Sequence, residues 1–110
     1  MSIPSIFEVL QSTGLPAAYS HFDKETQPPF VVYTGAGQNQ THADNEIYFS
    51  ENVYQVEFYF TRKDEEAEAA LEEALQAGLF NYTKSEDVYI EDQDIFVIYY
   101  DVARKGLQDG

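Results

Sequence analysis

The segment VYQVEFYFT, residues 53–61, alternates apolar residues with mixed ones and is followed, after Arg62 and Lys63, by an acidic helical repeat. Its even-numbered residues, from Tyr54 to Phe60, are all apolar and fall on one face of an extended chain. The odd-numbered face includes Glu57 and Tyr59. We therefore expect a strand with its even-numbered side toward the core and with Glu57 and Tyr59 half exposed.

Residues Asp64–Ala77 change to a helical period. Asp64 is a good N-cap, and the acids that follow it in the first turns favour the positive end of the helix dipole. The small and apolar residues recur every three or four positions and predict a narrow buried stripe: Ala67, Ala70, Leu71, Ala74 and Leu75. Gly78 is expected to end this helix.

The same change of period occurs elsewhere in the chain. A first helix is expected at Ser5–Ser12, with Ser5 as N-cap and Gly14 in a left-handed conformation after its end. Short strands are expected at Leu15–Phe22, Pro29–Tyr33 and Glu46–Phe49, with two or three more between Leu79 and Val102. The pattern predicts one α+β domain over residues 1–110, with a mostly antiparallel sheet, two helices packed on one side of it, and the order α-β-β-β-α-β-β.

The last strand, Ile95–Val102, is apolar on both faces. Such a strand is either central in a sheet or covered on its outer side by another subunit. The second alternative gives a set of expected residues for an interface with a partner or a second copy: Tyr59, Ile95, Val97 and Tyr99.

The segment Thr34–Asn45 contains no large apolar residue. Without a core contact it is expected to project from the domain as an arm or as a flexible assembly loop. The residues of interest in this loop are Gly35, Gly37, Asn39, His42, Asp44 and Asn45. The tail Arg104–Gly110 is expected to be frayed.

Composition limits the partners. Twenty acids against six bases give a formal net charge of −14, which repels phosphate backbones and anionic membrane surfaces. The chain contains no Cys, which excludes disulfides and thiolate chemistry. No segment is apolar enough to span a membrane, and the N-terminus lacks the features of a signal peptide. We expect an intracellular protein without specific nucleic-acid binding and without a membrane partner.

No catalytic pattern is visible. His42 and Asp44 are too few ligands for a stable metal site, and the Gly35 and Gly37 pair lacks the remaining residues of a phosphate-binding loop. The acidic run Glu91–Asp94 lacks the spacing of an EF-hand and is better explained as a hairpin turn. We expect no enzymatic activity, no metal and no cofactor.

Several segments together resemble a known family: Leu15–Phe22, Pro28–Tyr33 (PPFVVY), Ala43–Asn45 (ADN), Tyr54–Tyr59 (YQVEFY), Tyr89–Glu91 and Phe96–Tyr100 (FVIYY). They resemble the small tail terminator, or tail-completion, proteins encoded in the morphogenesis modules of long-tailed, siphovirus-type phages and prophages of Gram-positive bacteria. The similarity runs from about Phe7 to Val102.

The resemblance implies a structural virion protein, located at the tail end and assembled in the cytoplasm of the bacterial host. Proteins of this family form a homo-oligomeric ring, expected to be a hexamer, that caps the tail tube and joins it to the head. The implied partners are the major tail tube protein and a head-completion protein, and DNA would pass through the ring. The sequence does not show which acids face the lumen, and Asp44 and Glu46, in and beside the segment Thr34–Asn45, are the candidates. Two alternatives stay open: a head-completion or connector protein, and an acidic inhibitor that mimics DNA.

Overall fold

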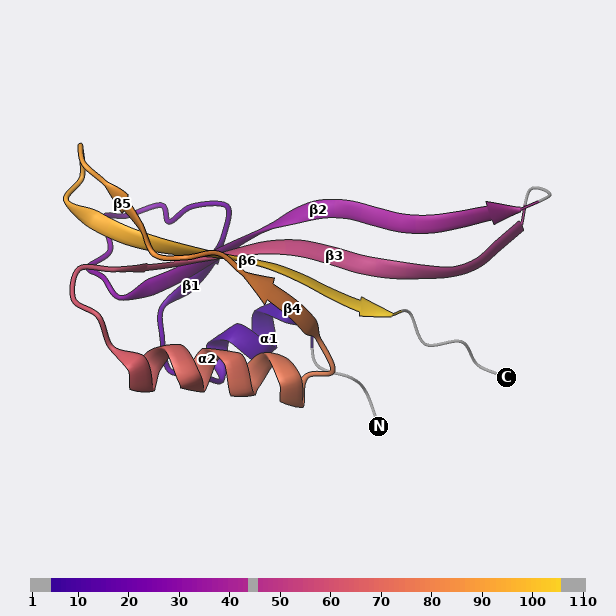
Figure 1. The fold of residues 1–110 in the computed structure, drawn as a ribbon, viewed down its shortest axis with the longest axis horizontal. Coiled ribbons are helices and arrows are strands. Elements are labelled where there is room, and N and C mark those ends of the chain that lie inside the picture. Colours follow the sequence, from indigo (N-terminus) through magenta and orange to yellow (C-terminus); the bar gives the residue numbers. More distant parts are fainter. Residues whose placement is uncertain (1–4, 44–45, 106–110) are drawn as a thin grey trace.

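The segments with two-residue alternation form a sheet, and the two segments with a helical period form helices that pack against it. A computed structural model describes residues 5–43 and 46–105. In it a six-stranded sheet lies over two helices that cover the same side (Figure 1). The fold is therefore α+β, as the sequence predicts.

Eight elements follow one another along the described chain: α1 (Ile6–Gln11), β1 (Ala17–Tyr19), β2 (Phe30–Ala43), β3 (Glu46–Phe60), α2 (Glu65–Ala77), β4 (Asn81–Lys84), β5 (Val88–Ile90) and β6 (Ile95–Lys105). The strand order is β1-β2-β3-β6-β4, and β5 also pairs with β6. All pairs are antiparallel except β1 with β2. Strand β6 is central, which explains why it is apolar on both faces.

Helix α1 is short and depends on its cap and its packing. The Ser5 hydroxyl accepts a hydrogen bond from the Glu8 amide at 3.1 Å, and the Glu8 carboxylate accepts one from the Ser5 amide at 2.8 Å. Such a capping box satisfies two backbone donors that the first turn leaves free. Gly14 has φ +86°, the left-handed conformation expected after the helix end. Because six residues are too few for a stable isolated helix, burial of Ile6, Val9 and Leu10 must hold α1 in place.

Helix α2 begins after the predicted cap. An Asp64 carboxylate oxygen accepts hydrogen bonds from the amides of Glu66 and Ala67 at 3.1 and 3.2 Å. Leu71 and Leu75 are completely buried, as predicted. The predicted stripe is wrong at one position, because Ala70 is exposed and Glu68 is buried instead.

The core lies between the helices and the facing side of the sheet. It contains Val56, Phe58 and Phe60 of β3, so the even-numbered side of this strand faces the core as predicted. Gly78, just after α2, lets the helices approach closely: a Cβ placed there would lie 2.5 Å from a methyl group of Val9. A side chain at position 78 would therefore push α1 and α2 apart.

Of the two forms expected for Thr34–Asn45, an arm or a loop, the loop is wrong for Thr34–Ala43, which belongs to β2. These residues pair with β3 from Thr34 opposite Gln55 to Ala43 opposite Glu46, with two register shifts. The physical reason is that a strand ladder is made of backbone hydrogen bonds and does not require apolar side chains. Asp44 and Asn45 lie outside the described residues.

Three other predicted boundaries also change. The two strands expected at Glu46–Phe49 and Val53–Thr61 are one continuous strand, β3. The strand expected at Leu15–Phe22 is reduced to the three residues of β1. Arg104 and Lys105, expected in a frayed tail, pair with Asn52 and Glu51 as the end of β6, and residues 106–110 lie outside the described part.

Candidate functional site

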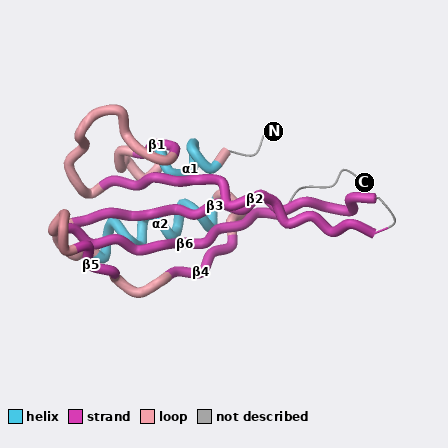
Figure 2. Tube along the Cα trace, turned by 90° about the horizontal axis from the view of Figure 1, so that it is seen from above, coloured by secondary structure: helices cyan, strands magenta, loops and turns pink. Residues whose placement is uncertain are grey.

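The far ends of β2 and β3 form a two-stranded ribbon that leaves the domain (Figures 1 and 2). We call this ribbon the arm and define it as residues 36–43 of β2 and 46–50 of β3. Strand β1 pairs with β2 only at Val31–Tyr33, and β6 pairs with β3 only from Glu51 onward. Among the described residues, no third strand pairs with the arm. It contributes to the elongated shape of the molecule, which measures 49 × 30 × 27 Å along its principal axes.

Within residues 5–43 and 46–105, the arm has two open edges and no layer of helices or strands packed against it. Both helices lie under the other half of the sheet (Figure 1). A two-stranded ribbon on its own is at best marginally stable in water. The outer edge of β2 from Thr34 to Ala43 contains no Asp, Glu, Lys, Arg or Pro, the residues that commonly protect an open edge, although its two register shifts interrupt the ladder. This edge is therefore open to pairing with another chain.

The opposite side of the sheet carries no helix, and we call it the helix-free face. Register places Phe30, Tyr59 and Val97 side by side on this face, with Val32, Glu57 and Tyr99 in the next row. The rings of Phe30 and Tyr59 stack at 5.1 Å, and Phe22 packs edge-on against Phe30 at 5.2 Å. The chain between β1 and β2 thus covers part of the helix-free face.

Two of the four residues expected at an interface are already buried within the single chain. Ile95 is 7% exposed and Val97 is not exposed at all in the single chain. The expectation that these two residues contact a partner is therefore wrong for this structure, since they have almost no surface to offer. Tyr59 and Tyr99 are partly exposed and remain available.

Next to Tyr59 the helix-free face is hollowed. The hollow has a volume of about 270 Å³. It is lined by Ser20, His21, Phe22, Lys24, Thr26, Phe30, Val32, Tyr59 and Gln93. We call it the Phe30 hollow. Aromatic rings form much of its wall, its basic side chains are Lys24 and His21, and no carboxylate belongs to the lining.

Tyr59 is fixed on the wall of this hollow. Its hydroxyl donates a hydrogen bond to a Glu57 carboxylate oxygen at 2.6 Å. Burial and this hydrogen bond raise the pKa of Tyr59 far above its ordinary value, so the phenol stays neutral in any physiological buffer. Tyr59 therefore acts as an aromatic surface held in one orientation.

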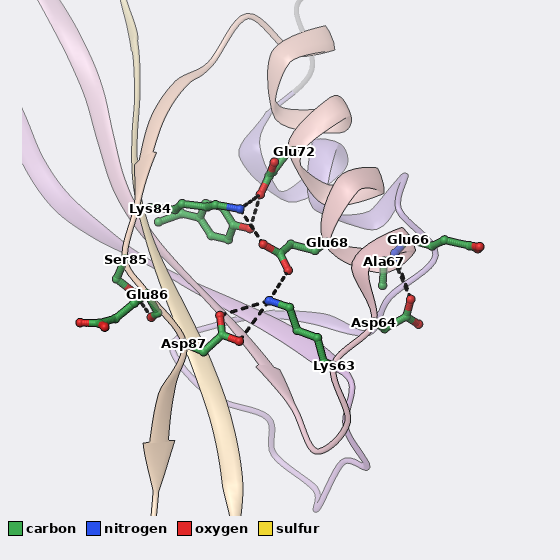
Figure 3. Close-up of polar contacts among 11 residues, drawn as sticks. Lys63, Asp64, Glu66, Ala67, Glu68, Glu72, Lys84, Ser85, Glu86 and Asp87 are labelled. Atoms are coloured by element: carbon green, nitrogen blue, oxygen red, sulfur yellow. Dashed lines mark hydrogen bonds and ion pairs between the residues drawn. The ribbon is translucent and has the colours of Figure 1, made fainter.

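A network of five charged side chains lies on the helix side (Figure 3). Lys63 contacts Glu68 at 2.7 Å and Asp87 at 3.1 Å. Lys84 contacts Glu68 at 2.6 Å and Glu72 at 2.7 Å. The network ties α2 to β4 and to the segment before β5, and it explains how Glu68 can be buried.

The network also determines how its acids titrate. Burial alone would raise the pKa of Glu68, but hydrogen bonds from Lys63 and Lys84 outweigh it and hold this pKa below its usual value. Glu72 behaves in the same way, with burial opposed by Lys84 and by the Tyr100 hydroxyl, which donates a hydrogen bond to it at 2.8 Å. We assign the network to stability, because each lysine in it is matched by carboxylates of the same chain.

The residues singled out in the sequence do not form one site. Gly35, Gly37, Asn39 and His42 lie in β2, and Asp44 and Asn45 lie outside the described residues. Tyr59 and Tyr99 lie on the helix-free face, far from the tip of the arm. Sequence reasoning missed the Phe30 hollow, because no local signal shows that the chain around Phe22 folds back over the sheet.

Two further observations limit the chemistry. Within residues 5–43 and 46–105, no three His, Cys, Asp or Glu side chains gather in a way that would hold a metal ion. In the same ranges, no helix is both long and apolar enough to cross a bilayer.

No known protein family model matches this chain. No curated protein is similar to it either.

Proposed function

We propose that this protein is a tail terminator, a ring-forming subunit that caps the tail tube of a long-tailed phage and joins it to the head. The observation that carries the proposal is the arm, a strand pair whose two edges are open among the described residues. It leaves the rest of the domain, residues 5–35 and 51–105, which we call the base. Such a ribbon gains stability when it is covered or extended by another chain. A second copy in a ring supplies that cover.

The shape of the subunit supports a cyclic assembly. The arm lies at one end of the long axis (Figure 1). Strand β3 runs from the arm to its last residues, Tyr59 and Phe60, and Tyr99 pairs with Glu57 there, so the partly exposed Tyr59 and Tyr99 lie away from the arm. When one surface of a subunit contacts a different surface of the next copy, the contact repeats along the assembly. It closes into a ring when the rotation between copies permits. The resemblance described above adds the expectation of a hexamer.

The charge of the chain suits a channel for DNA. A ring of subunits with a formal charge of −14 each repels phosphate, so a genome would pass without binding to its wall. The partners in this proposal are other copies, the major tail tube protein and a head-completion protein. No catalytic step and no cofactor enter it.

The proposal is tested by electron microscopy of lysates from which the gene has been deleted. A terminator stops the addition of tube subunits, so its loss should give heads beside unjoined tails of uncontrolled length. Tails of normal length joined to heads would reject the proposal. Full heads that leak DNA, beside free tails of normal length, would instead assign the chain to head completion.

A further inference from the structure

We infer that the Phe30 hollow is the docking site for the arm of a neighbouring copy. This inference rests on the proposed ring and specifies its subunit contact. It commits to one partner, a second molecule of this chain, and to one pair of surfaces.

Geometry makes the contact intermolecular. Tyr59, on the wall of the hollow, and Glu46, at the end of the arm, belong to the same strand and are thirteen positions apart. An extended strand rises about 3.3 Å per residue, so the two lie roughly 40 Å apart. The arm of one molecule therefore cannot reach its own hollow, and any such contact joins two copies; in the proposed ring it repeats from each subunit to the next.

The hollow and the arm match in hydrophobic character. The wall of the hollow is aromatic, and the Phe30 ring contacts the rings of both Phe22 and Tyr59. The sequence of the arm includes Ile47, Tyr48 and Phe49 in a row, in a part of β3 that pairs only with β2 among the described residues. At about 270 Å³ the hollow is smaller than most cofactor sites and suits one or two side chains.

Their charges are also complementary. Lys24 lines the hollow beside His21, and among the described residues Lys24 forms no ion pair. Residues 34–53 contain Asp44, Glu46 and Glu51 but no Lys or Arg. In a chain with more than three acids per base, a hollow lined by a lysine and by no carboxylate is the exception. The acids nearest to it are Asp23 and Glu25, which adjoin Lys24 in the sequence, and Glu57, which binds the Tyr59 hydroxyl. An acidic arm therefore has a favourable partner in the hollow of its neighbour.

Disulfide trapping tests the contact directly, because the chain has no Cys of its own. Lys24→Cys protein is mixed with Glu46→Cys protein and oxidised mildly, in solution and on purified tail tubes. We expect a covalent heterodimer, and we expect the double variant to give a ladder that ends at the ring size. The matched control pairs Glu46→Cys with Glu73→Cys, since Glu73 is exposed on α2, on the other side of the sheet. Equal yields from test and control would overturn the inference.

Charge reversal gives a second measurement. Lys24→Glu should weaken assembly about fivefold at low salt, the effect of a single accessible ion pair, and Glu46→Lys in the same chain should restore it. Weakening without restoration would reject the pairing of these two residues.

The failures of the two proposals can be told apart. Assembly without the Lys24–Glu46 cross-link rejects the docking site and leaves the ring. If the cross-link forms but the deletion lysate contains normal tails joined to heads, the docking site is supported and the terminator function is rejected. No assembly in solution or on tubes rejects both.

Discussion

The base and the arm share two strands but differ in what holds them. In the base, β3 lies between β2 and β6, and its side chains Val56 and Phe58 are buried under the helices. In the arm, the same strand pairs only with β2 among the described residues. The chain thus forms a base that can fold by itself and an extension that depends on contacts made elsewhere.

This difference shows how one strand can serve two purposes. Burial of apolar area stabilises the base, at about 25 cal/mol for each Å² removed from water. The arm gains no comparable burial from the helices, since they do not extend under it (Figure 1). It is free to make its main contacts with another molecule.

The largest effect is expected from removing the arm. Replacing residues 39–51 by Asn-Gly would connect Gln38 to Asn52, which are already paired, through a two-residue hairpin turn. We expect assembly to be lost entirely, because the surface that contacts the neighbour is gone. The free energy of unfolding should change by less than about 1 kcal/mol, because the core is untouched. Size-exclusion chromatography and a urea titration measure the two quantities. A shortened protein that still assembles would show that the arm is not the contact.

The next largest effect is expected within the base. Leu71 is completely buried on α2, so Leu71→Ala should lower the free energy of unfolding by about 2–5 kcal/mol. Glu73 is exposed on the same helix, and Glu73→Gln should change it by less than about 0.5 kcal/mol. The reverse order in a denaturant titration would mean that the face of α2 that carries Glu73, and not the face that carries Leu71, packs on the sheet.

The charged network predicts a smaller effect that depends on pH. Glu68→Gln removes the negative charge that binds two lysines. We expect it to lower the free energy of unfolding by about 1–3 kcal/mol at neutral pH. The pKa values of Glu68 and Glu72 are lowered in the folded protein, so their contribution is complete above the pKa of the unfolded chain, about 4.3. It is lost as the pH falls through the lower, folded values.

A comparison of variants isolates this contribution from the general repulsion among acids. Wild type and Glu68→Gln should therefore differ in stability at pH 7 and converge as the pH falls below about 4. The control Glu65→Gln, exposed in the first turn of α2, should show no such convergence. A difference for Glu68→Gln that stays constant down to pH 3 would contradict the role of the network.

The smallest effect is expected on the helix-free face. Tyr59→Phe removes the hydroxyl bound to Glu57 but keeps the ring stacked on Phe30. Because both residues are partly exposed, the free energy of unfolding should fall by less than about 1 kcal/mol. Assembly should be unchanged, since the aromatic surface is retained, and sedimentation velocity would measure it. A strong loss of assembly would assign the contact to the hydroxyl and not to the ring.

Sequence reasoning could predict the base because its signals are local. Three features follow from the conformational preferences of residues that are close in sequence: the alternation in residues 53–61, the helix cap at Asp64 and the left-handed conformation of Gly14. The position of Glu68 could not be predicted in this way, because its burial depends on Lys84 of β4 as well as on Lys63, just before α2.

The same limit applies to the arm and the hollow. A polar stretch such as Thr34–Ala43 resembles a loop in composition, and only its pairing with β3 makes it a strand. The Phe30 hollow exists because Phe22 and Lys24, before β2, come to lie beside Tyr59 and Gln93. The hollow arises from contacts that are distant in sequence, and the arm arises from hairpin pairing that the composition of Thr34–Ala43 does not indicate.

Amide hydrogen exchange, measured in the free protein and in the assembly, tests most directly whether the arm is held by a neighbouring copy. In the free protein, we expect the amides of residues 39–43 and 46–50 to exchange at least about 100-fold faster than those of Val56 and Ile98 in the base. In the assembly, the arm should become protected while the base changes little. An arm as strongly protected as the base in the free protein, or one that stays unprotected in the assembly, would contradict the account.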